Sequence, residues 1–312
     1  MTRIARLVRP AARAALVAVG VVLATFVLLG LVPGDAASAL LGSRATPEAV
    51  AALREDFGLD LPWYARLGAF ISDVLTGSLT SYVNGQPVTA LIAARAAPTA
   101  TIVLAALVVA AAVSAALALA AAAHHDRPVD QIVRIVSTAG VAVPSFLLGM
   151  ALILVFGVRL RWFPVGGVDD GFLSYVLPAV TAASAVVPVV TRSLRVQLLE
   201  VSGSDVVAAA RAAGFSERRV TFGVLLPNAA IPALTLLGLN VAYLVGGTFV
   251  VEQVFGIHGL GALMFDAIQD RDVPVVQGVV LYTALAVVLV GVVTDVVVRA
   301  IDPRRRVEGA VV

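Results

Sequence analysis

The sequence predicts an all-α membrane protein with six transmembrane helices. Of its 312 residues, 60% are hydrophobic and 13% are charged, whereas a soluble domain carries about 25% charged residues. Six segments lack charged side chains and are long enough to cross a bilayer, because about 20 residues at about 1.5 Å each span the hydrocarbon core. These expected spans are residues 14–32, 96–123, 135–158, 172–191, 220–251 and 273–294.

The arginines predict the orientation of these spans, because cytoplasmic loops carry an excess of basic residues. If both termini are cytoplasmic, the inner segments hold 15 arginines and eight acidic residues, and the outer segments hold seven arginines and 12 acidic residues. We therefore expect an N-in, C-in arrangement. The first apolar segment also resembles a signal peptide, with AASA at 36–39 as a cleavage site. Its 19 residues exceed the usual core of about 7 to 15, so we expect it to remain as a span.

Between the first two spans lies a polar region, residues 33–95, which is expected to form a small extracytoplasmic insertion. Thr46-Pro47 predicts the start of a short helix, and Gly58 predicts its end. Residues 61–75 are typical of an amphipathic helix at a membrane interface. The expected divisions of the chain are a cytoplasmic tail with the first span (1–32), the insertion (33–95), a five-helix core (96–300) that includes a cytoplasmic loop (192–227), and a cytoplasmic tail (301–312).

Two missing residue types limit the chemistry of the chain. The absence of cysteine excludes disulfides and thiolate metal sites, and the absence of lysine excludes a P-loop. Any ATP that the protein uses therefore binds on another chain. The cluster His124-His125-Asp126 is a candidate metal site, but we interpret it as a solvated loop in which Asp126 or Asp130 begins the next helix. The only other histidine, His258, is expected across the membrane, so we expect no metal.

The expected spans contain no Asp, Glu or His. An intramembrane hydrolase needs such groups, and an ion-coupled carrier or proton pump is expected to carry one. We therefore expect no enzyme activity. The same absence weakens an ion-coupled carrier, and a self-sufficient secondary transporter or channel stays as the alternative function. Mildly polar side chains in the spans either line a solute path or bond to helix backbone. The candidates for a path are Thr181, Ser184, Asn240, Tyr243 and Thr248.

The loop between the fourth and fifth expected spans is long for a helix connection. Ser204-Asp205 predicts the start of a helix that Gly214 ends, and Ser216-Glu217 predicts the start of a second helix that Pro227 halts. We call residues 205–227 the knob. Its small alanine surfaces and its arginines predict a docking site for another protein on the side of the membrane where ATP is available.

The knob resembles the cytoplasmic motif of binding-protein-dependent ABC-importer permeases, Glu-Ala-Ala-x3-Gly-x9-Ile-x-Leu-Pro. Ala209-Ala210, Gly214, Val224 and Leu226-Pro227 match this motif, and Ala208 stands where the motif has glutamate. Nearly the whole chain resembles the dipeptide, oligopeptide and nickel branch of these permeases. The matching stretches include ARAAGFSERRV at 210–220, VPSF at 143–146, VVEQVFGIHGLG at 250–261, DAIQDRDVPVVQG at 266–278 and DPR at 302–304.

This resemblance implies a type I ABC-importer permease fold in the inner membrane of a bacterium. The chain would be a non-catalytic subunit that pairs with a second homologous permease and forms half of the translocation pathway. Two ATPase subunits would carry ATP and Mg, and an extracytoplasmic binding protein would deliver the solute; nucleic acid is not expected as a partner. The solute stays open between a di- or oligopeptide, a nickel complex, glutathione and a sugar.

The resemblance also implies which residues couple the permease to its ATPases. Because Ala208 lacks the carboxylate of the motif, Asp205 and Glu217 are the candidates to replace it. The expected coupling residues are Asp205, Ala208, Ala209, Ala210, Arg211, Gly214, Glu217, Arg218, Arg219, Leu226 and Pro227.

Overall fold

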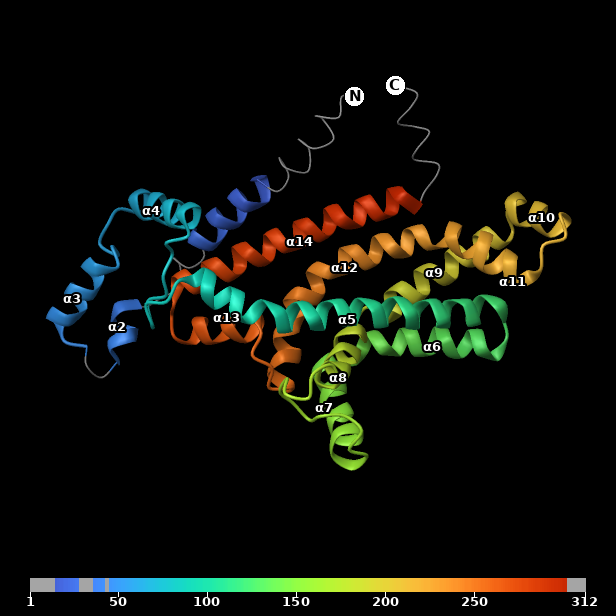
Figure 1. The fold of residues 1–312 in the computed structure, drawn as a ribbon, viewed down its shortest axis with the longest axis horizontal. Coiled ribbons are helices and arrows are strands. Elements are labelled where there is room, and N and C mark those ends of the chain that lie inside the picture. Colours follow the sequence, from blue (N-terminus) through green and yellow to red (C-terminus); the bar gives the residue numbers. More distant parts are fainter. Residues whose placement is uncertain (1–14, 28–35, 43–44, 302–312) are drawn as a thin grey trace, which may run out of the picture. The chain divides into compact units, whose positions relative to one another are not determined.

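The computed structural model describes residues 15–27, 36–42 and 45–301 (Figure 1). Within these ranges the regular structure is helical, apart from one isolated antiparallel bridge between Thr80 and Pro87. The described residues group into two compact units. One contains residues 100–257 and 289–301, and the other contains the remaining described residues.

The second of these units contains the expected insertion. The α3 helix begins as predicted, because Thr46 Oγ1 accepts a hydrogen bond from the N–H of Ala49 at 3.2 Å. Gly58, with φ +61°, follows its end in the left-handed conformation that glycine adopts most easily. Phe70 and Val88 lie in the core of the unit. The helices of this unit are Ala15–Val27, α2 (Ala36–Leu41), α3 (Pro47–Asp56), α4 (Trp63–Thr76) and α13 (Leu260–Gln269), with the adjoining ends of α5 (Val88–Ala123) and α14 (Val273–Ile301).

The loop after α4 is held to the start of α14 by Asp272. One carboxylate oxygen of Asp272 accepts a hydrogen bond from the N–H of Tyr82 at 3.0 Å, and the other accepts one from the hydroxyl of Ser81. The ring of Tyr82 stacks on Phe57 with centroids 4.1 Å apart. Partial burial raises the pKa of the Tyr82 phenol above its ordinary value. We call Ser81, Tyr82 and Asp272 the Asp272 cluster.

The first unit is built around α9, which packs against both α6 and α12. Leu194 and Leu198 of α9 and Leu244 of α12 are buried in one core. Fully buried alanines on α5, such as Ala106, let neighbouring helices approach closely. Besides the adjoining parts of α5 and α14, the helices of this unit are α6 (Pro128–Ala142), α7 (Ser145–Leu152), α8 (Leu173–Ala183), α9 (Val187–Ser202), α10 (Asp205–Ala212), α11 (Glu217–Val220) and α12 (Leu226–Val254), with π-helical turns at Ile153–Arg159 and Thr221–Leu225.

Three described helical runs are long and apolar enough to cross a membrane: Val88–Ala123, Glu217–Val254 and Val273–Val298. Two bent helix pairs raise the number to five if each pair forms one span. The first expected span, 14–32, lies partly outside the described residues and contains the apolar helix Ala15–Val27. The count of six and the orientation therefore stay predictions.

The third and fourth expected spans, residues 135–158 and 172–191, are bent in the structure. The first pair, α6 with the helical run Ser145–Arg159, bends by 104°, and the second pair, α8 with α9, bends by 62°. Val143 is extended because the following proline, Pro144, disfavours the helical conformation of the residue before it. In the second pair, α9 continues to Ser202 and so occupies the beginning of the expected loop.

Candidate functional site

The first helix of the knob, α10, forms where the sequence predicts. Ser204 has the extended backbone of an N-cap residue (φ −80°, ψ 155°), although its hydroxyl donates to the carbonyl of Val201 at 2.6 Å instead of capping the helix. Asp205 adds a negative charge to the first turn, which the helix dipole favours. Gly214 has φ +79° and ends the α10 segment. No atom lies within 4 Å of a Cβ placed on Gly214, so backbone conformation and not space requires glycine there.

The second helix begins as predicted but does not end as predicted. Ser216 Oγ accepts a hydrogen bond from the N–H of Arg219 at 3.4 Å and caps α11. Pro227 was expected to halt this helix, but the helical run continues from Glu217 to Val254. The π-helical turn Thr221–Leu225 widens the helix before the proline, so that the N–H of Leu226 bonds the carbonyl five residues back. Leu226 and Pro227 therefore lie inside a continuous helix.

Two valines of the knob are buried, and its π-helical turn Thr221–Leu225 contacts α9. Val207 of α10 is fully buried and Val220 of α11 is 1% exposed. The α10 helix contacts both α11 and the π-helical turn. By contrast, every residue from 211 to 219 is exposed. The knob therefore combines buried valines at Val207 and Val220 with an exposed stretch from residue 211 to residue 219.

The open side of the knob carries paired charges. Arg211 Nε and Nη2 donate to the two carboxylate oxygens of Glu217 at 2.9 and 3.2 Å, across the Gly214 turn. The guanidinium of Arg219 lies 4.2 Å from the ring centroid of Phe215, in a cation–π contact. An open pocket of about 380 Å³ is lined by Ser216, Arg218, Arg219 and Phe222.

Asp205 and Glu217, the candidates to replace the motif glutamate, differ in the contacts that their carboxylates make. Ala208 and Ala209 are exposed on α10, and Ala210 is half-buried. Asp205 is also exposed, whereas the carboxylate of Glu217 already accepts two hydrogen bonds from Arg211.

The residues considered for a solute path lie on α8 and α12 or in the bend after α8. Four of them donate to nearby backbone carbonyls: Thr181 to Leu177, Ser184 to Thr181, Asn240 to Leu236 and Thr248 to Val245, at 2.7 to 2.8 Å. Tyr243 is 59% exposed. The α12 helix also runs past the expected end of the fifth span and contains Glu252, which is fully buried.

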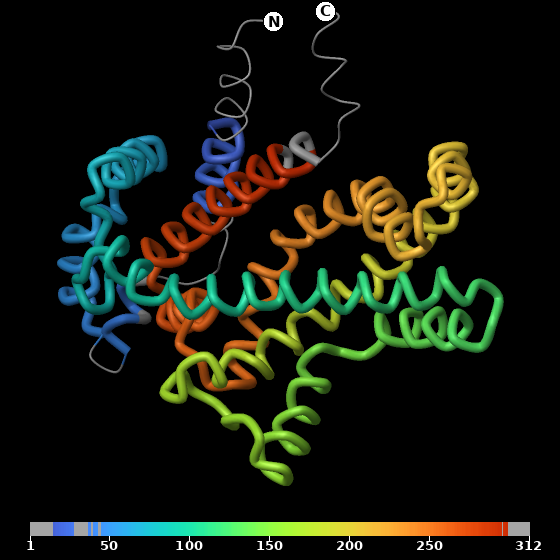
Figure 2. The backbone as a smooth tube through the Cα atoms, turned by 45° about the vertical axis from the view of Figure 1, so that its right-hand side comes forward, coloured from blue at the N-terminus to red at the C-terminus, as the bar shows by residue number. Residues whose placement is uncertain are grey.

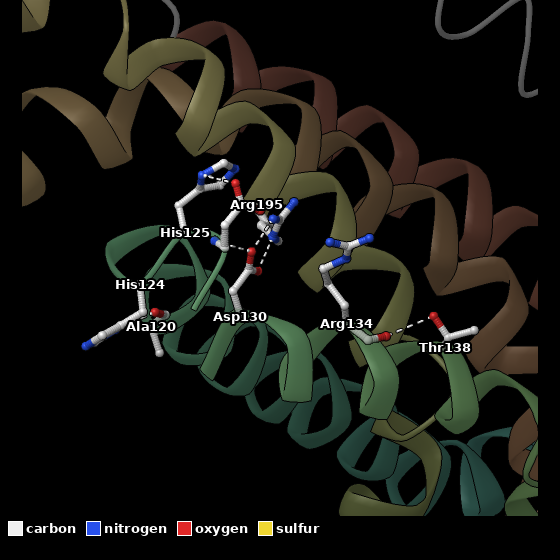
Figure 3. Close-up of polar contacts among 8 residues, drawn as sticks. Ala120, His124, His125, Asp130, Arg134, Thr138 and Arg195 are labelled. Atoms are coloured by element: carbon white, nitrogen blue, oxygen red, sulfur yellow. Dashed lines mark hydrogen bonds and ion pairs between the residues drawn. The ribbon is translucent and has the colours of Figure 1, made fainter. Parts of the chain in front are cut away.

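The structure adds a buried ion pair that the sequence did not indicate (Figure 3). Arg195 Nε and Nη2 donate to the two carboxylate oxygens of Asp130, both at 2.5 Å. One of these oxygens also accepts a hydrogen bond from the N–H of Asp126 at 3.1 Å. The partners are 65 residues apart in the sequence, so no local pattern links them.

The histidine cluster lies beside this pair. His124 Nδ1 is 2.9 Å from the carbonyl of Ala120, and His125 Nδ1 is 3.1 Å from a carboxylate oxygen of Asp126 (Figure 3). The ligand atoms of His125, Asp126 and Asp130 lie within 4.8 Å of one another. Both oxygens of Asp130 already accept hydrogen bonds from Arg195, so a metal would have to compete with a guanidinium.

Comparison with known proteins identifies the class of protein, an ABC-importer permease. The fold resembles the MetNI methionine ABC transporter in inward-facing conformations, with a TM-score of 0.54, 18% identity, and coverage of 70% of this chain and 99% of that chain. Residues 112–307 match the profile of the binding-protein-dependent transport system inner membrane component, and residues 1–105 match the profile of its N-terminal segment.

Curated relatives extend this match over most of the chain. The chain is 36% identical to the glutathione transport system permease protein GsiC of Escherichia coli (strain K12), over 90% of this chain and 92% of the relative. It is 37% identical, with the same coverage, to GsiC of Salmonella typhimurium. The chain belongs to the binding-protein-dependent transport system inner membrane component family and is a permease subunit of an ABC importer. The family indicated by the sequence motifs is confirmed.

Proposed function

We propose that this permease imports a small peptide or peptide-like compound such as glutathione. The support is the similarity over 90% of the chain to permeases named for glutathione transport. By this proposal the chain has no catalytic role and forms half of the translocation pathway together with a second homologous permease. Two ATPase subunits supply the energy from ATP and Mg, and an extracytoplasmic binding protein delivers the solute.

The knob is the proposed contact with an ATPase subunit. The observation that carries this proposal is its construction: two short helices joined by a left-handed glycine, with Val207 and Val220 buried on one side and residues 211–219 exposed on the other. Exposed alanines permit close approach, and Arg218 and Arg219 offer positive charge. Because the run from Glu217 to Val254 is continuous, displacement of the knob acts directly on α12.

Substitution of the turn glycine tests this contact. Gly214→Val places a β-branched residue at φ +79° and should lower both the co-purification of the ATPase subunits and solute uptake, while membrane insertion persists. Gly203→Val is the matched control, because Gly203 has φ −87° and a Cβ there would lie 3.7 Å from the carbonyl oxygen of Glu200, an ordinary contact distance. Normal ATPase co-purification and uptake with Gly214→Val would contradict the proposal.

Reconstituted vesicles separate an ABC importer from a self-sufficient carrier. The permease pair should accumulate glutathione only when ATP, the ATPase subunits and the binding protein are all present. Uptake by this chain alone under an ion gradient would contradict the proposed energy source.

Single cysteines test the proposed orientation, with six spans and both termini cytoplasmic. The chain contains no cysteine, so an introduced thiol is the only one on it. A membrane-impermeant maleimide should label Asn84→Cys in intact spheroplasts and Ala212→Cys only after permeabilisation; both positions are exposed. Labelling in the reverse pattern would contradict the orientation.

A further inference from the structure

The ion pair between Asp130 and Arg195 lies inside the protein. The side chain of Asp130 is fully buried and that of Arg195 is 14% exposed. The planar guanidinium meets both carboxylate oxygens, a geometry that determines the direction as well as the distance of the contact. An apolar contact has no preferred direction, whereas the two-pronged ion pair has one. The pair therefore specifies how α9 packs against α6.

The same carboxylate joins three elements (Figure 3). Asp130 lies in the first turn of α6, Arg195 lies on α9, and the N–H of Asp126 belongs to the turn between α5 and α6. Asp126 has φ +58°, which is unusual for a residue other than glycine, so its hydrogen bond to Asp130 also holds a strained turn. The α9 helix, α6 and this turn therefore meet at one buried carboxylate.

The pair lies on the helix that leads into the knob. Arg195 precedes Ser202, the last residue of α9, by seven residues, or about two turns. Gly203 and Ser204 then connect α9 directly to α10. In both backbone views α9 runs into the knob at one end (Figures 1 and 2). The α6 helix packs against α9. Leu194 and Leu198 flank Arg195 on the buried side of α9.

We propose that Asp130 and Arg195 are positioning residues for coupling between the ATPase subunits and the permease. The ion pair makes α6 and α9 move together, so that force on the knob reaches α6 instead of tilting α9 alone. This inference rests on the proposed docking of an ATPase at the knob. It adds a second route into the membrane core, through α9 and α6, beside the direct one through α12.

Coupling is measured as the factor by which the loaded binding protein stimulates ATP hydrolysis by the reconstituted importer. The binding protein is loaded with glutathione or with a dipeptide mixture, whichever stimulates the wild-type complex more. Arg195→Lys keeps the positive charge but loses the two-pronged contact, and Arg195→Met loses both. We expect each variant to assemble with the ATPase subunits and to lower the stimulation factor about threefold or more.

The matched control is Arg192→Met, which removes an exposed arginine from the same helix. It should leave the stimulation factor unchanged. A purely stabilising ion pair would lower the amount of assembled complex without changing stimulation per complex. Unchanged stimulation in assembled Arg195→Lys and Arg195→Met complexes would therefore overturn the proposal.

If the single substitutions fail to assemble because they leave a buried charge without its partner, a cross-linked variant tests the same contact with neither charge present. Asp130→Cys/Arg195→Cys, in a chain with no other cysteine, is joined in the assembled importer by a short cleavable bis-thiol reagent. Cross-linking should raise the stimulation factor and cleavage should lower it again; a cross-link that leaves the factor low would overturn the proposal. Gly214→Val, measured in the same assay, distinguishes failure of this proposal from failure of the proposed ATPase docking. Normal stimulation of ATP hydrolysis in Gly214→Val would contradict docking at the knob itself.

Discussion

Gly238 of α12 lies directly against Thr294 of α14. A Cβ on Gly238 would lie 2.2 Å from Cγ2 and 2.7 Å from Cβ of Thr294. Rotation of the threonine moves its Cγ2 but not its Cβ, so a side chain at Gly238 cannot be accommodated without moving a helix. Membrane helices approach closely at small residues because packing, and not the hydrophobic effect, holds them together. A side chain at position 238 would therefore push α12 and α14 apart at this point.

We predict that Gly238→Val destabilises the protein by about 1 to 3 kcal/mol, because the added side chain clashes with Thr294 and forces the backbone to shift. The thermal midpoint of the detergent-solubilised protein checks this. Gly246→Val is the matched control on the same helix, because no atom lies within 4 Å of a Cβ on Gly246. Equal midpoints for the two variants would show that the α12–α14 contact tolerates a side chain.

The Arg211–Glu217 pair leads to a second prediction. Arg211→Glu places two carboxylates at the Gly214 turn, so α10 and α11 should separate and fewer ATPase subunits should co-purify. Exchange of the two residues, Arg211→Glu/Glu217→Arg, should restore co-purification because the reversed pair forms again. The same Glu217→Arg change should not rescue Arg218→Glu, because Arg218 lies outside this pair. If the exchanged pair behaved like Arg211→Glu alone, the two side chains would be acting on the partner and not on each other.

The Asp272 cluster leads to a third prediction. Asp272→Ala leaves the N–H of Tyr82 and the hydroxyl of Ser81 without their acceptor, a loss of about 1 to 3 kcal/mol for buried polar groups. Hydrogen–deuterium exchange at the amide of Tyr82 should accelerate. Asp270→Ala, at an exposed position two residues earlier, should not change this exchange rate. Similar exchange in both variants would mean that the hairpin of residues 80–87 is held by other contacts.

A fourth prediction concerns alkaline pH. Burial, the largest cause, raises the pKa of Tyr82 in the folded protein. Below about pH 10 the phenol is neutral in both the folded and the unfolded chain, so its contribution to stability is complete. Above that value the unfolded chain loses the proton first, and the free energy of unfolding falls as pH rises toward the folded pKa. The drop in thermal midpoint between about pH 8 and about pH 10.5 should therefore be smaller in Tyr82→Phe; an equal drop would contradict this role.

Local signals in the sequence predicted local structure well. Thr46 and Ser216 accept the capping hydrogen bonds expected of helix starts, and Gly58 and Gly214 adopt the positive φ expected after helix ends. Each of these features depends on residues within a few positions of one another. The helix end that the sequence predicts at Pro227 does not occur. A proline near the start of an α-helical segment is tolerated when a π-helical turn precedes it.

The sequence alone determined the class of protein, because apolar length, arginine distribution and the knob motif are properties of short segments. Only the tertiary structure decided where the helices bend, which glycine touches a neighbouring helix, and which charges meet. The sequence predicts that Asp126 or Asp130 helps to start the next helix, and Asp130 does lie in the first turn of α6, which begins at Pro128. Its pairing with Arg195 depends on the packing of α6 against α9. Such contacts join residues far apart in the chain, so their partners are chosen by the fold and not by neighbouring sequence.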